Sequence, residues 1–259
     1  MKERALIPLL TVSLLFAACP ALPAGAADLA ELCALGETAA VREALEDGEP
    51  VDAANERGMT ALHHTVRAGV RAPLSAHLEI IELLVAWGAD PNARDREGRT
   101  ALCLALEKGG AFTDLSGLLL ALGADPDLMS AGARPLCLAA ERGSPRQLEA
   151  LLEHGADAGL RDASGRDPLT AAFSGGGGPL TMKKTRLLIE AGADVNARCP
   201  LWGDEGVTPL MAAAAFASPD VVELLLDNGA LAGLRSGTGM LAHDYAVLAG
   251  REDNAFLLR

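Results

Sequence analysis

Five segments of similar sequence decide how this chain folds: GMTALHHTV at 58–66, GRTALCLAL at 98–106, GARPLCLAA at 132–140, GRDPLTAAF at 165–173 and GVTPLMAAA at 206–214. Each is followed by a second pattern: WGADPN at 87–92, LGADPD at 122–127, HGADAG at 154–159, AGADVN at 191–196 and NGALAG at 228–233. Two signatures that recur together indicate an internal repeat. A repeat array reaches 259 residues without a single central core, because each unit packs on its neighbours.

The first signature contains residues that begin a helix and bury one of its faces. Its Thr hydroxyl can cap the free amides at a helix start, and its Pro suits the first helical turn. The following leucines supply the apolar anchor of each unit: Leu62, Leu102, Leu136, Leu169 and Leu210. Leucine-rich runs then predict a second helix, which ends at the glycine of the second signature. The predicted unit is therefore a pair of helices followed by a projecting finger.

These paired signatures resemble the ankyrin family, whose unit of about 33 residues carries a T-P-L-H motif. The resemblance covers residues 28 to 259 and implies an α fold, a solenoid of stacked helix-turn-helix units with short β-hairpin fingers, here preceded by a signal peptide. The expected boundaries are 1–26 for the signal peptide, 28–56 for an N-terminal capping half-repeat, 57–96, 97–130, 131–163, 164–204 and 205–237 for repeats, and 238–259 for a C-terminal capping repeat with a wetter outer face.

The N-terminal segment predicts export. Basic residues at 2 and 4 precede an apolar run over 5–18 and the small-residue stretch PALPAGAA at 20–27. This pattern is typical of a signal peptide, cleaved here after Ala26, so we expect a periplasmic or secreted protein. Alternatively, FAAC at 16–19 resembles a lipobox, in which Cys19 would carry a lipid anchor and hold the protein at a membrane.

Composition narrows the class of partner. The formal charge of -13 disfavours nucleic acid, because phosphate contacts need clustered Lys and Arg. After the leader, no segment approaches the roughly 20 apolar residues of a membrane span. We therefore expect a monomer that binds another protein, with no nucleic acid and no membrane span.

Cysteine and histidine do not predict a metal or cofactor site. Cys103 and Cys137 occupy the same position in neighbouring units, so they should lie about 8–10 Å apart, beyond the roughly 7 Å Cα limit of a disulfide. We expect these thiols, with Cys33 and Cys199, to be free, although an exported chain with an even cysteine count also suggests disulfides. The resemblance implies a structural hydrogen bond for His63, and we expect no catalytic residue, metal or cofactor.

The partner site is expected among residues that vary from unit to unit. A lengthened finger at 199–206 holds Leu201 and Trp202, and the helix after it ends at Phe216, so exposed aromatics could form a binding hot spot there. In the alternative, Trp202 folds back on its own finger and Phe216 fills a gap. The further candidate contacts are Met240, Arg96, Arg99, Arg142 and Arg166.

Two other arginine features have mainly structural interpretations. One arginine recurs at the same finger position and forms a ladder of Arg94, Arg161, Arg198 and Arg235. The ladder could hold an acidic partner, but structure and solubility are the favoured roles. Arg134 replaces the capping Thr of its unit and cannot accept from backbone amides, which predicts a weaker third repeat.

The predicted function is a non-catalytic protein-protein interaction module of the cell envelope. The resemblance implies that its partner binds across the finger tips and first helices, the concave face. One alternative is a lipid-anchored envelope scaffold held through Cys19. A second is an enzyme of unrecognised type, which is disfavoured because no repeating motif assembles an acid, a base and a nucleophile.

Overall fold

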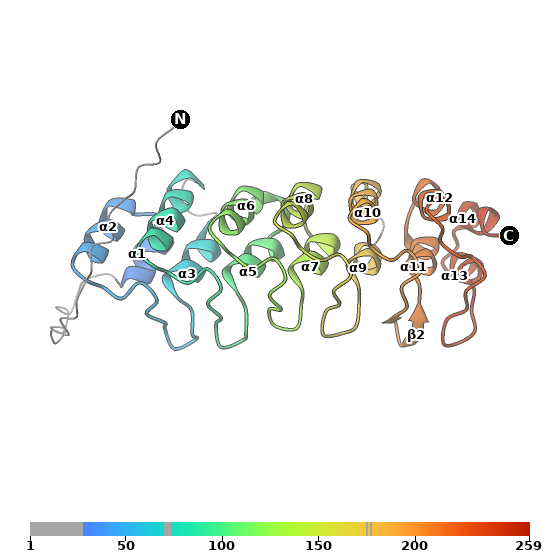
Figure 1. The fold of residues 1–259 in the computed structure, drawn as a ribbon, viewed down its shortest axis with the longest axis horizontal. Helices are drawn as coiled ribbons and strands as arrows, with labels where there is room; N and C mark the ends of the chain where they lie inside the picture. The colour runs from blue at the N-terminus through green and yellow to red at the C-terminus, as the bar shows by residue number, and fades with distance from the viewer. Residues whose placement is uncertain (1–27, 70–73, 175, 177) are drawn as a thin grey trace, which may run out of the picture.

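A computed structural model describes residues 28–69, 74–174, 176 and 178–259 and arranges them as a row of seven two-helix layers. The first helices lie in one row, the second helices lie in a parallel row, and the fingers between layers project on one side (Figure 1). This arrangement confirms the predicted solenoid. The predicted signal peptide and Cys19 fall outside the described residues.

Each layer contains a first and a second helix. The first helices are α1 (Leu29–Leu35), α3 (Ala61–Ala68), α5 (Ala101–Glu107), α7 (Pro135–Glu141), α9 (Pro168–Ser174), α11 (Pro209–Phe216) and α13 (Ala242–Leu248). The second helices are α2 (Thr38–Glu46), α4 (Leu74–Ala86), α6 (Thr113–Ala121), α8 (Pro145–Glu153), α10 (Thr181–Glu190), α12 (Pro219–Asp227) and α14 (Glu252–Leu257), with a 3-10 turn η1 (Gly109–Phe112) before α6. The segment predicted as an N-terminal half-repeat thus carries a complete pair of helices.

Two of the first helices, α5 and α11, begin with the predicted Thr caps, whereas Thr60 before α3 makes no side-chain cap bond. The Thr100 hydroxyl accepts from the Cys103 amide at 3.3 Å, and the Thr208 hydroxyl accepts from the Met211 amide at 3.3 Å. Arg134 provides no side-chain cap, as predicted from its lack of an acceptor. Its guanidinium instead donates to the carbonyl oxygens of Arg161, at 3.1 Å, and of Asp127. Arg134 therefore ties its unit to the fingers on both sides.

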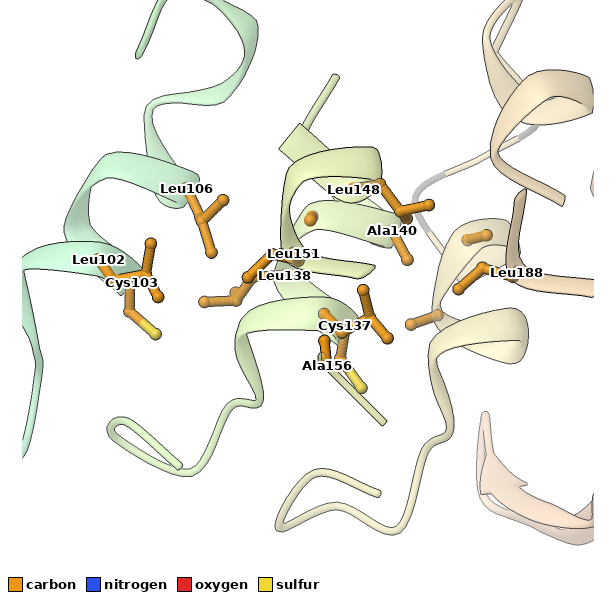
Figure 2. Close-up of a cluster of buried hydrophobic side chains, with 14 of the residues drawn as sticks. Leu102, Cys103, Leu106, Cys137, Leu138, Ala140, Leu148, Leu151, Ala156 and Leu188 are labelled. Carbon is orange, nitrogen blue, oxygen red and sulfur yellow. The ribbon is translucent and has the colours of Figure 1, made fainter. Parts of the chain in front are cut away.

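One continuous apolar core runs along the row of layers. The leucines that anchor the first helices, Leu62, Leu102, Leu136, Leu169 and Leu210, are buried and share this core. In Figure 2 the cluster passes from Leu102 and Leu106 of α5, through Leu138 of α7 and the leucines of α8, to Leu188 of α10. Each layer is thus stabilised by both of its neighbours rather than by a central core.

Two buried polar side chains join layers in a way that the sequence pattern did not predict. Lys184 of α10 donates from Nζ to the Ala140 carbonyl of α7 at 2.9 Å, and burial lowers the pKa of its ammonium. Asn254 of α14 donates to the corresponding carbonyl of α11, that of Ala214, also at 2.9 Å. Both carbonyls lie near the end of a first helix, where intrahelical donors run out. These side chains therefore satisfy backbone oxygens between layers.

The fingers are mostly turns rather than hairpins. Among the described residues a strand pair forms only in the lengthened finger, where β1 (Cys199–Leu201) pairs antiparallel with β2 (Asp204–Val207). In a shorter finger the Asp95 carboxylate accepts from the amides of Glu97 and Arg99, at 2.9 and 2.8 Å. A carboxylate that takes these amides closes the turn without a ladder of backbone bonds. The extra residues of the lengthened finger allow the two strands.

Adjacent fingers are linked by the side chains of the predicted arginine ladder. Arg161 donates to the Arg198 carbonyl at 2.7 Å, and Arg198 donates to the Arg235 carbonyl at 2.8 Å. An amide side chain, Asn196, adds a second link by accepting from the Leu231 amide at 2.9 Å. These bonds support the structural interpretation of the ladder, since they hold the fingers in a fixed row.

The C-terminal layer is less polar on its outside than predicted. Val247, Leu248 and Phe256 are all exposed there. Val247 occupies the place that Ala214 holds in α11, where α13 packs on the helix and buries that alanine completely. Among the described residues, no further layer packs on α13 in the same way. The wetter outer face expected of a capping unit is therefore wrong at Val247.

Candidate functional site

The lengthened finger turns tightly at a tryptophan. Leu201 pairs with Asp204, so only Trp202 and Gly203 connect the two strands. Both have positive φ, 53° for Trp202 and 78° for Gly203, as in the type I′ turns of two-residue hairpins. Asn-Gly is the usual pair in such turns, and a left-handed conformation costs a residue with a β-carbon about 1–2 kcal/mol. The finger therefore holds a large aromatic side chain where the backbone disfavours it.

Aromatic contacts offset this cost. The Trp202 ring lies 5.2 Å from that of Phe216 in α11 and 6.2 Å from that of Tyr245 in α13, measured between centroids. The planes are tilted by 53° and 45°, and such pairs contribute about 0.5–1.5 kcal/mol each beyond their buried area. We call Trp202, Phe216 and Tyr245 the aromatic cluster. It joins a finger to two successive first helices.

A buried carboxylate anchors the finger beneath this cluster. Asp204 follows the turn and accepts from the Thr238 amide at 3.0 Å, the Thr238 hydroxyl at 2.5 Å and the Tyr245 hydroxyl at 2.5 Å. Burial alone would raise the pKa of Asp204, but hydrogen bonds from Thr238, Tyr245 and Ser236 outweigh it and hold that pKa well below its usual value. The same carboxylate raises the pKa of Tyr245, together with burial. The finger is therefore fixed to the next finger and to α13.

The aromatic cluster borders an open hollow of about 560 Å³, which we call the C-terminal hollow. Its lining is completed by Ala215, Leu248, Ala249 and Arg251. Arg251 donates from Nε to the Ala215 carbonyl at 3.3 Å and from Nη2 to the Phe216 carbonyl at 2.6 Å. The guanidinium thus satisfies backbone oxygens at the end of α11 and is held beside the aromatic rings. An apolar surface and one positive charge meet in this hollow.

The residues predicted for the hot spot fall into two groups. Trp202 and Phe216 lie together, and they remain 48% and 37% exposed, so their contact leaves surface for a partner. Leu201 is only 8% exposed and points into the core, so it supports the finger and offers no contact surface. Met240 is half-buried against the same core. Leu201 is therefore removed from the candidate contacts.

Two of the predicted arginines are engaged within the chain. Arg99 pairs with Asp95 at 2.8 Å, and Arg166 pairs with Asp162 at 2.9 Å and with Glu141 at 3.2 Å. Burial would raise the pKa of each aspartate, but hydrogen bonds from the arginine and from nearby groups lower both pKa values overall. Binding a partner through Arg99 or Arg166 would break these pairs. Their main role in this structure is to hold fingers in shape.

The remaining arginines lie on the surface away from the hollow. Arg142 is exposed and contacts Glu141 at 3.3 Å, and the side chain of Arg96 is exposed on its finger. Neither lines the C-terminal hollow, whereas Tyr245, Leu248 and Arg251 do. The sequence pattern did not predict these last three residues. The one available signal was Tyr245, which replaces the small Ala212 at the same position of the repeat.

His63 makes the structural contacts that the resemblance implied. Its Nδ1 accepts from the Thr60 amide at 3.2 Å, and its Nε2 lies 3.0 Å from the Arg99 carbonyl of the next unit. A neutral imidazole fits both contacts, because one nitrogen accepts while the other donates. Burial lowers the pKa of His63, which favours the same neutral form. The ring therefore links two neighbouring repeats.

We expect His63 to make stability depend on pH below about 6.5, the usual histidine pKa. The unfolded chain takes up a proton there, while folded His63 stays neutral until its lowered pKa is reached. Stability should therefore fall with acid by at most about 1.4 kcal/mol per pH unit for this proton. Urea unfolding at pH 7 and pH 5 tests this, with His63→Gln as the comparison. Equal pH dependence in both proteins would contradict the assignment.

The four described cysteines are buried thiols. Cys33, Cys103, Cys137 and Cys199 are free and buried, and burial raises the pKa of Cys33 and Cys137 to about 12 and that of Cys199 to about 11. In the part of the chain that the structure describes, no group of three or more His, Cys, Asp or Glu side chains is placed to hold a metal ion. Within the same residues, no helix is both long and apolar enough to cross a membrane.

Comparison with known proteins accounts for the repeating architecture. The family model for ankyrin repeats, which holds three copies of the repeat, matches residues 29–130, 70–162 and 136–235. This chain belongs to the ankyrin-repeat family. The motif residues quoted above therefore maintain an ankyrin solenoid, and the aromatic cluster lies outside those motif residues.

Several known ankyrin proteins are similar to this chain over most of its length. The mouse ankyrin repeat and SOCS box protein 16 is 34% identical over 220 residues, which are 83% of this chain and 46% of that protein, so the chain spans about half the length of this relative. The human ASB11 ankyrin repeat domain superposes with a TM-score of 0.71 at 26% identity, covering 90% of this chain and 98% of that domain. An ankyrin domain from Acinetobacter baumannii gives 0.69 at 26% identity, covering 78% and 98%.

Proposed function

We propose that this chain is a non-catalytic module that binds another protein through its fingers and first helices, the concave face of an ankyrin array. Ankyrin repeats are protein-protein interaction modules, and the fingers here are held in a row by side chains of successive units. A surface fixed before binding loses little conformational entropy when a partner docks.

The aromatic cluster is the observation that carries this proposal. Trp202 has a strained backbone conformation and a side chain that is nearly half exposed. Phe216 beside it is also exposed. Tryptophan and tyrosine are enriched among residues that dominate binding energy, and strained backbone concentrates at functional sites. Asp204 and Tyr245 keep this surface rigid through a buried hydrogen bond. Such a cluster supports a binding hot spot at the lengthened finger.

We further propose that the protein acts in the cell envelope. The support is the sequence of residues 1–26, which has basic residues, an apolar run and a small-residue end. Cleavage after Ala26 would give a periplasmic or secreted protein, whereas lipidation of Cys19 would give an anchored scaffold. Mass spectrometry of the mature amino terminus separates these outcomes. A chain that retains Met1 in the cell would contradict export.

The hot spot is tested by Trp202→Asn, because Asn-Gly favours the same turn and removes only the ring. We expect the affinity for a partner captured by crosslinking to fall about 30-fold, which corresponds to the roughly 2 kcal/mol of a hot-spot residue. Phe216→Ala should reduce the affinity in the same direction. Binding is measured with the purified partner by calorimetry.

Trp87→Asn provides a matched control for this experiment. Trp87 is 46% exposed, close to the 48% of Trp202, but it lies at the end of α4, far along the row of layers (Figure 1). We expect its replacement to leave the affinity unchanged. If Trp202→Asn and Phe216→Ala bind the partner with native affinity, the lengthened finger is not the hot spot.

A further inference from the structure

Arg251 gives the C-terminal hollow a positive charge and N–H donors, which the aromatic cluster alone lacks. Nε and Nη2 together commit two of its five N–H groups to the carbonyls of Ala215 and Phe216. Within the described residues no carboxylate pairs with Arg251, whereas Arg99 and Arg166 each have a buried aspartate. The free edge of its guanidinium therefore lies beside an apolar surface without an acidic partner in the chain.

From this juxtaposition we propose that the C-terminal hollow binds a segment of the partner protein that carries an aromatic or leucine side chain next to one carboxylate. The apolar side chain packs against Trp202, Phe216 and Leu248, and the carboxylate pairs with Arg251. This inference rests on the proposed binding function and specifies the chemistry of the partner. Charge-assisted bonds from a guanidinium to a carboxylate are among the stronger hydrogen bonds in proteins.

The position of Arg251 favours this pairing. Its two bonds to the end of α11 hold the planar group in place, so little side-chain entropy is lost when a carboxylate docks. Once the hollow is filled, its apolar lining keeps water away from the guanidinium and the bound carboxylate. The attraction between these two charges is then stronger. A lysine or arginine of the partner would instead face Arg251 and be repelled.

The surrounding charge restricts the partner further. The chain carries -13 overall, and Glu252 and Asp253 follow Arg251 directly. A run of acidic residues would be repelled by these groups, whereas a single carboxylate can reach the guanidinium through local attraction. The bound segment is therefore apolar with one acid, and it is not an acidic tract.

The test is a selection of random peptides displayed on phage against the purified, folded chain. The enriched peptides are expected to place Asp or Glu within two residues of Phe, Trp, Tyr or Leu. Synthetic peptides of the enriched sequence should bind Arg251→Gln about tenfold more weakly, because the variant keeps a donor near the position of Nε for the Ala215 carbonyl but loses the charge. On Arg251→Glu, the selection should shift from acidic to basic peptides. Circular dichroism checks that both variants are folded.

Three results would overturn the inference. Peptides could be enriched on the native chain no more than on Trp202→Asn, the enriched peptides could lack an acidic residue, or they could bind Arg251→Gln and the native chain equally. Trp87→Asn serves as the control and should bind the peptides like the native chain. Peptides that bind the native chain and Trp202→Asn equally would contradict the hollow while leaving a binding function elsewhere on the concave face. Failure of the inference is thus distinguishable from failure of the proposed function.

Discussion

Replacing Leu148 with alanine is expected to lower the free energy of unfolding by about 2–5 kcal/mol. Leu148 is fully buried in α8, which packs on α6 and on α10, and it belongs to the continuous core shown in Figure 2. The loss combines the removed apolar surface with a cavity between layers that the packed neighbours only partly fill. Because each repeat is stabilised by its neighbours, the damage should extend to the adjoining layers.

Urea unfolding followed by circular dichroism measures this effect, and amide hydrogen exchange shows where it spreads. Leu231→Ala is the matched control, since Leu231 lies in a finger and is 56% exposed. Its replacement should change stability by less than about 0.5 kcal/mol. A loss at Leu148 no larger than at Leu231 would contradict the continuous core.

Replacing Asp204 with alanine should lower the free energy of unfolding by about 1.5–3 kcal/mol, the range for hydrogen bonds to a charged group. The Tyr245 hydroxyl and the Thr238 amide would lose their acceptor beneath the aromatic cluster. The finger would then be held by the Arg198 bond to the Arg235 carbonyl, the Asn196 bond to the Leu231 amide and the ring contacts around Trp202. We therefore expect weaker binding at the C-terminal hollow as well as lower stability.

The carboxylate should also make stability depend on acid. Because hydrogen bonds lower the folded pKa of Asp204 despite its burial, its contribution is complete above about pH 4, the usual unfolded value. It is lost as pH falls below that value towards the folded pKa. Asp204→Asn cannot titrate and should show a smaller loss between pH 5 and pH 3. The same loss in both proteins would contradict the network, and Tyr245→Phe measures the share of its hydroxyl.

Repetition made the architecture predictable. A helix start such as Thr100-Ala101-Leu102 combines a cap with an anchor, and the same local signals recur in several units. A recurrent local signal needs no knowledge of distant contacts, so helix pairs, finger positions and buried leucines followed from it. His63 was assigned a structural bond by resemblance, and the structure shows that bond to Arg99.

The candidate site was predictable only in part. The aromatic pair Trp202 and Phe216 stood out because both depart from the repeat in one unit, and their rings meet. Leu201 departs from it too, but the pairing of β1 with β2 turns its side chain inward. Which face of a hairpin a residue occupies depends on register, and a one-residue change reverses it. The exposure of these neighbours therefore could not be read from their spacing.

By itself, the sequence determined that this protein is an array of ankyrin repeats with one lengthened finger, because repeated caps, glycines and leucines encode each unit locally. Only the tertiary structure decided which charges are free. Arg99 and Arg166 are neutralised by aspartates of their own fingers, whereas Arg251 meets the aromatic cluster without an acidic partner among the described residues. The two aspartate pairs are local, because each joins residues four apart in one finger. Arg251 reaches the aromatic cluster through contacts between layers, where residues distant in the chain become neighbours and no local pattern records the encounter.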